Sequence, residues 1–206
     1  MKKYTTFLLV LILVLSLTAC GSKEADYIPV HPLDAGLGLS DSVLDGQIAI
    51  EGVVYQMPIP VSELVANGWN MDVLDMDMEP HSYTLVSFKK EDLRFDTLVS
   101  NQYSSNTHLS QCHVVEATFG PQTTDTKSYY SSGRPLINVQ FTSGLNISSS
   151  EEDLIGALGQ PADSSLTWAA PKADRSFFGV EFSAQYNKDG TLFSFTLQYL
   201  PADFQP

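Results

Sequence analysis

The sequence predicts an α+β protein in which short helices pack on antiparallel sheets, divided into two small tandem modules. Apolar and polar residues alternate in many short runs bounded by Gly, Pro, Asn and Asp, which is the pattern of short strands joined by turns. Two short segments show the spacing of an amphipathic helix instead. The chain of 206 residues is long enough for one large core or two small ones, because domains typically contain ~100 to 150 residues.

Changes in composition predict the domain boundaries. Residues 21–40 contain several prolines and glycines without helical or strand periodicity, which indicates a tether. Residues 120–135 are rich in Thr, Ser, Tyr and Gly, which indicates a linker or a long surface hairpin. We therefore expect a signal segment over 1–19, an N-terminus and tether over 20–44, a first α+β module over 45–120, a linker or long hairpin over 121–134, and a second α+β module over 135–206.

The first module begins with two predicted strands. Ile48 and Ile50 precede the turn pair Glu51-Gly52, and Val53–Tyr55 follows it. Alternation returns further along the chain. It predicts additional strands at residues 83–88, 93–99 and 112–119.

A short helix is predicted between these strands. Val61, Leu64 and Val65 share one helical face, and Asn67-Gly68 supplies the left-handed backbone that commonly ends a helix. Trp69 follows directly and is expected to close the first core.

The second module contains a second short helix. Ser148–Asp153 places hydroxyl and carboxylate side chains where a helix start leaves its amides free. Leu154, Ile155 and Leu158 then lie on one face, and Gly159 ends the helix. We expect this helix to cover a neighbouring sheet.

A strand at residues 137–141 precedes that helix, and a hairpin follows it. Residues 180–186 and 191–199 alternate between apolar and polar side chains around the turn at 187–190. The hairpin therefore has one apolar face that needs a cover, and the helix ending at Leu158 is the predicted cover.

A family resemblance follows from these elements. The segment GLNISSSEEDLIGALGQP, residues 144–161, is followed by an aromatic strand and by FSAQYNKDGTLFSFTL. This arrangement resembles the helix-then-sheet module of outer-membrane lipoproteins of the SmpA/OmlA type and of beta-lactamase inhibitor proteins. The first half, GVVYQMPIPVSELVANGW, is similar to the front part of many small lipoproteins of Gram-positive bacteria. The resemblance implies a binding or assembly role through an exposed sheet face, without naming a partner. It rests on structural residues, namely Leu154, Leu158, Gly159, Pro161, Asp189 and Gly190.

The N-terminus carries an export signal. Lys2 and Lys3 precede an apolar run from Phe7 to Leu17, which is shorter than the roughly twenty residues of a membrane-spanning helix. The run ends in LTACG, residues 17–21, which resembles the lipobox of bacterial lipoproteins. The resemblance implies cleavage before Cys20 and a diacylglycerol on its thiol, so that Cys20 anchors an extracytoplasmic protein to the bacterial cell membrane. An ordinary cleaved signal with an incidental cysteine is the alternative.

The chain is strongly acidic, with a formal net charge of -13 at pH 7. Removal of residues 1–19 takes away two lysines and no acids, which leaves nine Lys and Arg against twenty-four Asp and Glu, a charge of -15. Such a surface repels nucleic acid and anionic head groups, so we expect no nucleic-acid partner. Cationic ligands or divalent ions suit this charge, and a charge that only keeps the protein soluble is the alternative.

Candidate metal ligands and nucleophiles are sparse. The densest acidic segment, residues 72–79 followed by His81, has no glycine at the turning position of a calcium-binding EF-hand loop. His108, Cys112 and His113 lack the paired spacing of a structural zinc site. Cys112 lies in an apolar run, where a free thiol behaves as a small buried residue. We assign no catalytic residue, metal or cofactor. The acidic segment contains Asp72, Asp75, Asp77 and Glu79.

Aromatic residues in loops are the remaining binding candidates, because such residues are enriched where proteins bind partners. Trp168 is predicted to make a sheet-edge contact, and Tyr129 and Tyr130 are the other candidates. The favoured function is a noncatalytic binding or assembly role at the cell envelope, with a protein, a peptide or an envelope polymer as partner. The alternative is an envelope hydrolase or a divalent-metal-binding lipoprotein, in which acids or histidines from distant segments meet in one concave site.

Overall fold

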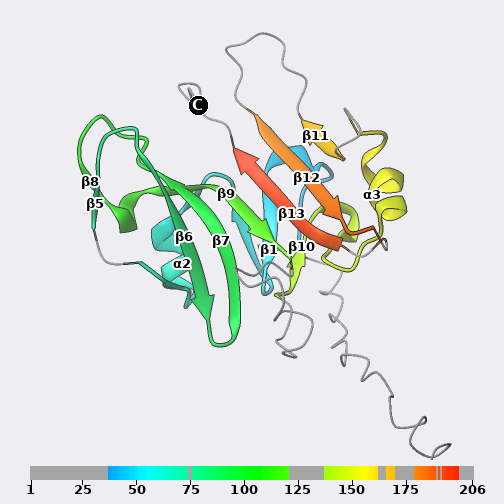
Figure 1. Ribbon diagram of the computed structural model, residues 1–206, viewed down its shortest axis with the longest axis horizontal. Coiled ribbons are helices and arrows are strands. Elements are labelled where there is room, and N and C mark those ends of the chain that lie inside the picture. Colours follow the sequence, from blue (N-terminus) through cyan, green and yellow to red (C-terminus); the bar gives the residue numbers. More distant parts are fainter. Residues whose placement is uncertain are drawn as a thin grey trace, which may run out of the picture.

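A computed structural model describes residues 37–73, 76–120, 137–161, 166–169, 179–188, 190 and 192–199. Within these residues the protein is a sheet-rich α+β fold with few, short helices (Figure 1). The elements up to residue 120 are η1 (Val43–Asp45), β1 (Gln47–Ile50), β2 (Val53–Gln56), β3 (Ile59–Pro60), α2 (Val61–Ala66), β4 (Asn70–Met71), β5 (Asp77–Met78), β6 (Tyr83–Lys90), β7 (Leu93–Ser100), β8 (Thr107–His108), η2 (Leu109–Gln111) and β9 (His113–Phe119). The later elements are β10 (Val139–Gln140), η3 (Thr142–Gly144), α3 (Glu151–Leu158), β11 (Thr167–Ala169), β12 (Val180–Tyr186) and β13 (Leu192–Tyr199).

One large antiparallel sheet organises the fold. Its strand order is β11-β12-β13-β9-β7-β6-β4, and β3 pairs with β9 beside this path. A three-stranded sheet, β10-β1-β2, lies behind it together with α2, while α3 lies beside the β11–β12 end (Figure 1). The core is therefore enclosed between the large sheet and the elements behind it. No helix among the described residues is long and apolar enough to cross a membrane.

The predicted turns and strands of residues 45–120 are confirmed. Glu51 and Gly52 join β1 to β2 with positive φ values of 50° and 80°, the backbone that a two-residue hairpin turn requires. β6, β7 and β9 form where alternation predicts them. The fold begins before residue 45, however, because Val43 is 2 % exposed and belongs to the core.

Both predicted helices are present. α2 buries Val61 and Leu64 and ends at Asn67 and Gly68, but Val65 is 44 % exposed and does not belong to the buried face. α3 begins with a capping box. In it, the Ser150 side chain accepts from the Asp153 N–H, and the Asp153 carboxylate accepts from the Ser150 N–H. The Ser150 N–H and the Ser150 hydroxyl both donate to this carboxylate, and these two hydrogen bonds lower the pKa of Asp153.

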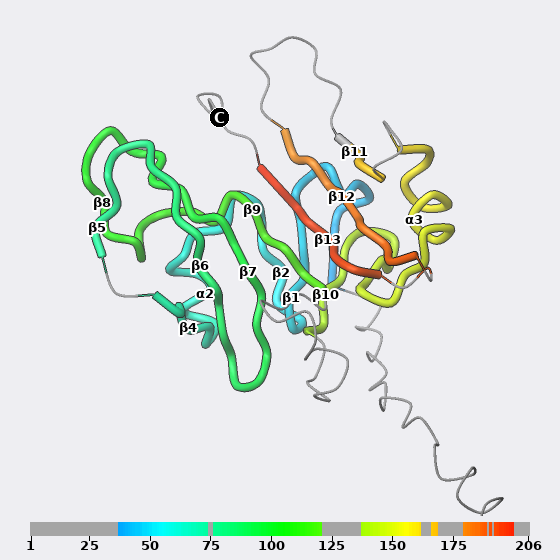
Figure 2. Tube along the Cα trace, in the orientation of Figure 1, coloured from blue at the N-terminus to red at the C-terminus, as the bar shows by residue number. Residues whose placement is uncertain are grey.

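The structure does not confirm a division into two tandem modules. β13, from the predicted second module, pairs with β9 of the first, and β10 pairs with β1. The buried side chains of both halves also form a single hydrophobic cluster. The described residues of the two predicted modules thus share one sheet and one core. Figure 2 shows β9 running between the β6–β7 and β12–β13 hairpins.

The β12–β13 hairpin is confirmed, but its cover differs from the prediction. The ring of Phe141, directly after β10, packs 4.9 Å from that of Phe182 and 5.5 Å from that of Phe195. α3 contributes the buried Leu154 at the side of this cluster. A register shift near Tyr186 displaces Phe193 from the apolar face, and its side chain is 39 % exposed.

Candidate binding face

The large sheet has an inner face toward the core and an outer face toward the viewer in Figure 1. No described helix or strand lies in front of β12, β13, β9 and β7 on this side (Figure 1). Because side chains alternate between the two faces of a strand, the residues between the buried positions point outward. The strand register then places outward residues of neighbouring strands next to one another.

Two rows of outward residues cross the sheet. We call the first the hydroxyl row and the second the mixed row. The hydroxyl row runs through Ser87, Asp96, Thr118, Thr196, Ser183 and Thr167, from β6 to β11. The mixed row runs through Leu85, Leu98, Glu116, Gln198 and Glu181, from β6 to β12.

The hydroxyl row is held by hydrogen bonds among its own side chains. The Thr118 and Thr196 hydroxyl oxygens are 3.2 Å apart across β9 and β13. Ser87 donates to the Asp96 carboxylate at 2.5 Å, and the Arg94 guanidinium donates to both Ser87 and Asp96. Ser87, Asp96, Thr118 and Thr196 therefore each have a hydrogen-bond partner on this surface.

The mixed row contains exposed and partly exposed apolar side chains, and carboxylates that lack an ion-pair partner among the described residues. Leu85 is 75 % exposed, and its register neighbour Leu98 is partly exposed. Glu116 is partly buried, and this burial together with the nearby charge of Glu181 raises the pKa of Glu116. Among the described residues, no basic side chain forms an ion pair with either glutamate.

The cations of the outer face are engaged elsewhere. Lys89 pairs with Asp72 and Arg94 pairs with Asp96, both at the hairpin end of β6 and β7. The Lys89 ammonium is the main reason that the pKa of Asp72 is lowered. The outer face therefore has a neutralised end and an acidic centre, with the exposed Leu85 and the partly exposed Leu98 beside the acidic centre.

A buried asparagine fixes one border of this face. Asn101 is fully buried, and its Nδ2 lies within 3.0 Å of the carbonyl oxygens of Met78, Glu79 and Ser105. Its Oδ1 accepts from the N–H of Tyr103. The Tyr103 ring is 6.2 Å from that of His113, whose pKa is lowered by burial. Asn101 thus holds the loop that carries the exposed Tyr103.

Of the residues that the sequence selected for binding, Trp168 lies in the described part of the chain, and it is not on this face. Cys20, Tyr129 and Tyr130 lie outside the described residues. The sequence predicts Trp168 in a loop at a sheet edge; it lies on the edge strand β11 itself and is only 6 % exposed. Its indole N–H donates to the carbonyl of Gly159 at 3.0 Å. In this structure Trp168 ties β11 to the end of α3, so it is a packing residue and offers little surface to a partner.

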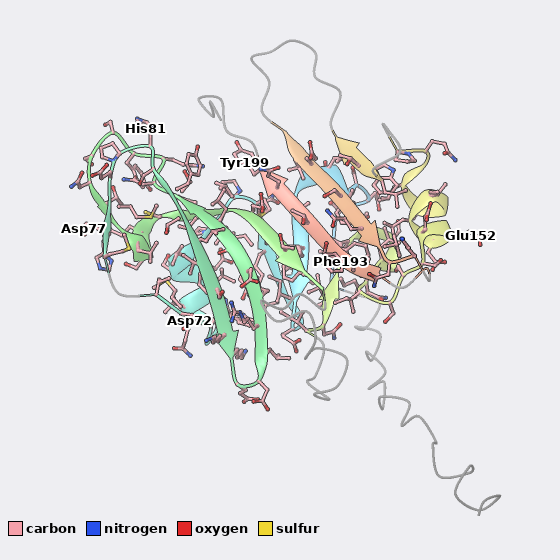
Figure 3. All side chains as sticks on the ribbon, viewed as in Figure 1. Asp72, Asp77, His81, Glu152, Phe193 and Tyr199 are labelled. Carbon is pink, nitrogen blue, oxygen red and sulfur yellow. The ribbon has the colours of Figure 1, made fainter. Side chains whose placement is uncertain are left out.

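The acidic segment does not assemble into a metal site in the described part of the chain. Asp72 lies well away from Asp77 and His81 (Figure 3). Asp75 falls outside the described residues, and Asp77 lies opposite His108 in the β5–β8 pair. Among the described residues, no group of three or more His, Cys, Asp or Glu side chains could hold a metal ion.

Cys112 is buried, as its apolar surroundings predict. Its thiol faces the carbonyl oxygens of His108 at 3.5 Å and of Thr107 at 3.9 Å. Burial raises the pKa of Cys112, which disfavours the nucleophilic thiolate.

Sequence reasoning missed Leu85, Leu98 and Glu116 as a group. The alternation within each strand already indicates which residues point outward. The register that aligns the three strands is set by tertiary structure, and a β-bulge between Leu98 and Val99 shifts it further.

Comparison with known proteins gives no relative. No family model, no curated protein and no solved structure matches the chain.

Proposed function

We propose that this protein is a membrane-anchored, extracytoplasmic lipoprotein with a noncatalytic binding or assembly role at the cell envelope. The lipobox-like segment ending at Cys20 supports the anchor, because a diacylated cysteine holds a protein stably at a bilayer. The flexible composition of residues 21–40 supports a tether between the anchor and the folded part. The strong negative charge keeps the folded part off an anionic membrane surface.

The observation that carries the binding role is the outer face of the large sheet. It joins the exposed Leu85 and the partly exposed Leu98 to a carboxylate pair without an ion-pair partner among the described residues, and no described element covers its centre. An antiparallel sheet with one solvated face normally fills that face with well-solvated polar residues. Exposed apolar side chains beside partly buried charge are more typical of a surface that contacts a partner.

The anchor is tested by metabolic labelling with a fatty acid. The native chain should be labelled, and Cys20→Ser should lose the label. Label that persists in Cys20→Ser would refute the anchor site.

The binding role is tested by crosslinking in intact cells followed by purification. Native protein should enrich a defined envelope component, and Cys20→Ser should enrich less of it, because the unanchored chain leaves the membrane surface. The proposed function is wrong if nothing is enriched while the purified protein hydrolyses an envelope substrate.

A further inference from the structure

We propose that the mixed row binds a basic segment of a partner protein, in which a lysine or arginine lies close to an aliphatic side chain. This inference rests on the proposed function and specifies the partner of the same face. The cationic group would lie over Glu116, Gln198 and Glu181, and the aliphatic group over Leu85 and Leu98.

The register fixes the spacing of these two subsites. Leu98 and Glu116 are direct neighbours across β7 and β9, and Gln198 lies between Glu116 and Glu181. Because adjacent strands are about 4.8 Å apart, Gln198 lies about 10 Å from Leu98 along the row. In an extended segment, residues i and i+2 point to the same side about 6.6 Å apart, and a lysine side chain spans the remaining distance. A Lys-x-Leu pattern therefore fits both subsites.

Electrostatics favours a cationic partner over other occupants. Two carboxylates without an ion-pair partner raise each other's free energy, and an ammonium or guanidinium between them would remove this repulsion. The net charge of -13 also attracts basic segments from a distance. The same charge repels anionic lipid head groups and acidic polymers.

The exposure of Leu85 favours a ligand that carries an aliphatic group as well as a cationic one. Leu85 is the most exposed of the large apolar side chains described, and it lies in the same row as the glutamates. A small polyamine would satisfy the carboxylates and leave Leu85 in water. A segment that carries both groups buries Leu85 as well, and removal of this apolar surface from water strengthens binding.

The test uses the full-length chain in detergent and five defined probes. Three are ten-residue synthetic peptides rich in threonine: one contains Lys-x-Leu, one has Glu in place of Lys, and one has Ser in place of Leu. Spermine represents a cation alone, and phosphatidylglycerol vesicles represent an anionic membrane. Binding is measured by calorimetry for the first four probes and by cosedimentation for the vesicles.

Two site variants and two matched controls complete the design. Glu116→Gln combined with Glu181→Gln removes the acidic subsite, and Leu85→Ser removes the apolar one. Glu151→Gln combined with Glu152→Gln makes the same charge change at exposed positions of α3, outside the mixed row, and Figure 3 shows Glu152 on the outer side of this helix. Val65→Ser makes a comparable change on the exposed side of α2. Thermal unfolding of each variant verifies that it folds.

We expect the Lys-x-Leu peptide to bind best, with about tenfold weaker binding to the double glutamine site variant and several-fold weaker binding to Leu85→Ser. Both controls should bind within about twofold of the native chain. Equal binding of the Glu peptide, equal binding of spermine, preferential binding of the vesicles, or no binding of the Lys-x-Leu peptide would each overturn the inference.

Failure of this inference is distinguishable from failure of the proposed function. If a cellular partner is captured equally by native protein, by Leu85→Ser and by the double glutamine site variant, the mixed row is not the docking site. The binding role itself would then stand.

Discussion

The two faces of the large sheet are built from the same strands but have different physical properties. On the inner face, Phe88, Phe95 and Phe119 stack with ring centroids 5.1 to 5.6 Å apart and are almost completely buried. On the outer face, Leu85 is largely exposed and Glu116 is without an ion-pair partner among the described residues. Alternation thus gives the two faces of each strand different roles: one set of residues stabilises the fold, and the other forms the face that we propose binds a partner.

The largest expected effect lies on the inner face. Phe95 contacts Trp69, Phe88 and Phe119, so Phe95→Ala should lower the free energy of unfolding by about 3–5 kcal/mol. Its outward neighbour Arg94 is the matched control, and Arg94→Ala should cost about 0.5 kcal/mol because its ion pair is exposed. Urea unfolding measures both. Similar losses for the two variants would contradict the division between the faces.

The second expected effect lies at the border of the outer face. Asn101→Ala removes the donors that serve three carbonyl groups in a buried position, and this should cost about 2–4 kcal/mol. Asn67→Ala is the control, because the Asn67 side chain donates to a single carbonyl, that of Glu63, in an exposed position. Its loss should stay under about 1 kcal/mol. Hydrogen exchange should also show faster opening of residues 101–107 in Asn101→Ala, and unchanged exchange there would contradict the role of Asn101.

Local signals in the sequence predicted local structure well. Gly52 predicts its turn because glycine adopts a positive φ without steric cost, and Ser150 with Asp153 predicts the start of α3 through its capping box. The β12–β13 hairpin follows from alternation alone. Each of these features depends on residues that are close together in the chain.

Long-range features could not be predicted in the same way. Nothing in residues 113–119 indicates that β9 lies between β7 and β13, and this pairing is what joins the two halves into one sheet. The burial of Trp168 could not be predicted for the same reason, because only the tertiary structure brings Gly159 to its indole N–H, and binding through Trp168 stays a prediction. The mixed row likewise depends on register, which a single sequence does not specify.

The smallest expected effect concerns the acidic centre of the outer face. Burial and the charge of Glu181 raise the pKa of Glu116, so the folded state holds its proton to a higher pH than the unfolded state does. Stability from this group is therefore fully present below about pH 4 and falls as the pH rises through the raised pKa. Glu116→Gln removes this loss. We expect it to unfold at the same urea concentration as native protein near pH 4 and at a higher one at pH 7.

The gain in stability of Glu116→Gln at pH 7 is small because Glu116 is only partly buried and water still screens its charge. Glu152→Gln is the matched control, because it makes the same charge change at an exposed position on α3, and its urea midpoint at pH 7 should stay close to that of native protein. Asp72 and Asp153, whose pKa values are lowered, lose their stabilising contribution as the pH falls. They do so equally in native protein and in Glu116→Gln, so they do not change the difference in stability between the two proteins. A Glu116→Gln variant that is less stable than native protein at pH 7 would mean that Glu116 has a stabilising partner. The acidic centre would then be a structural feature like the inner face, rather than a surface that needs a cationic partner.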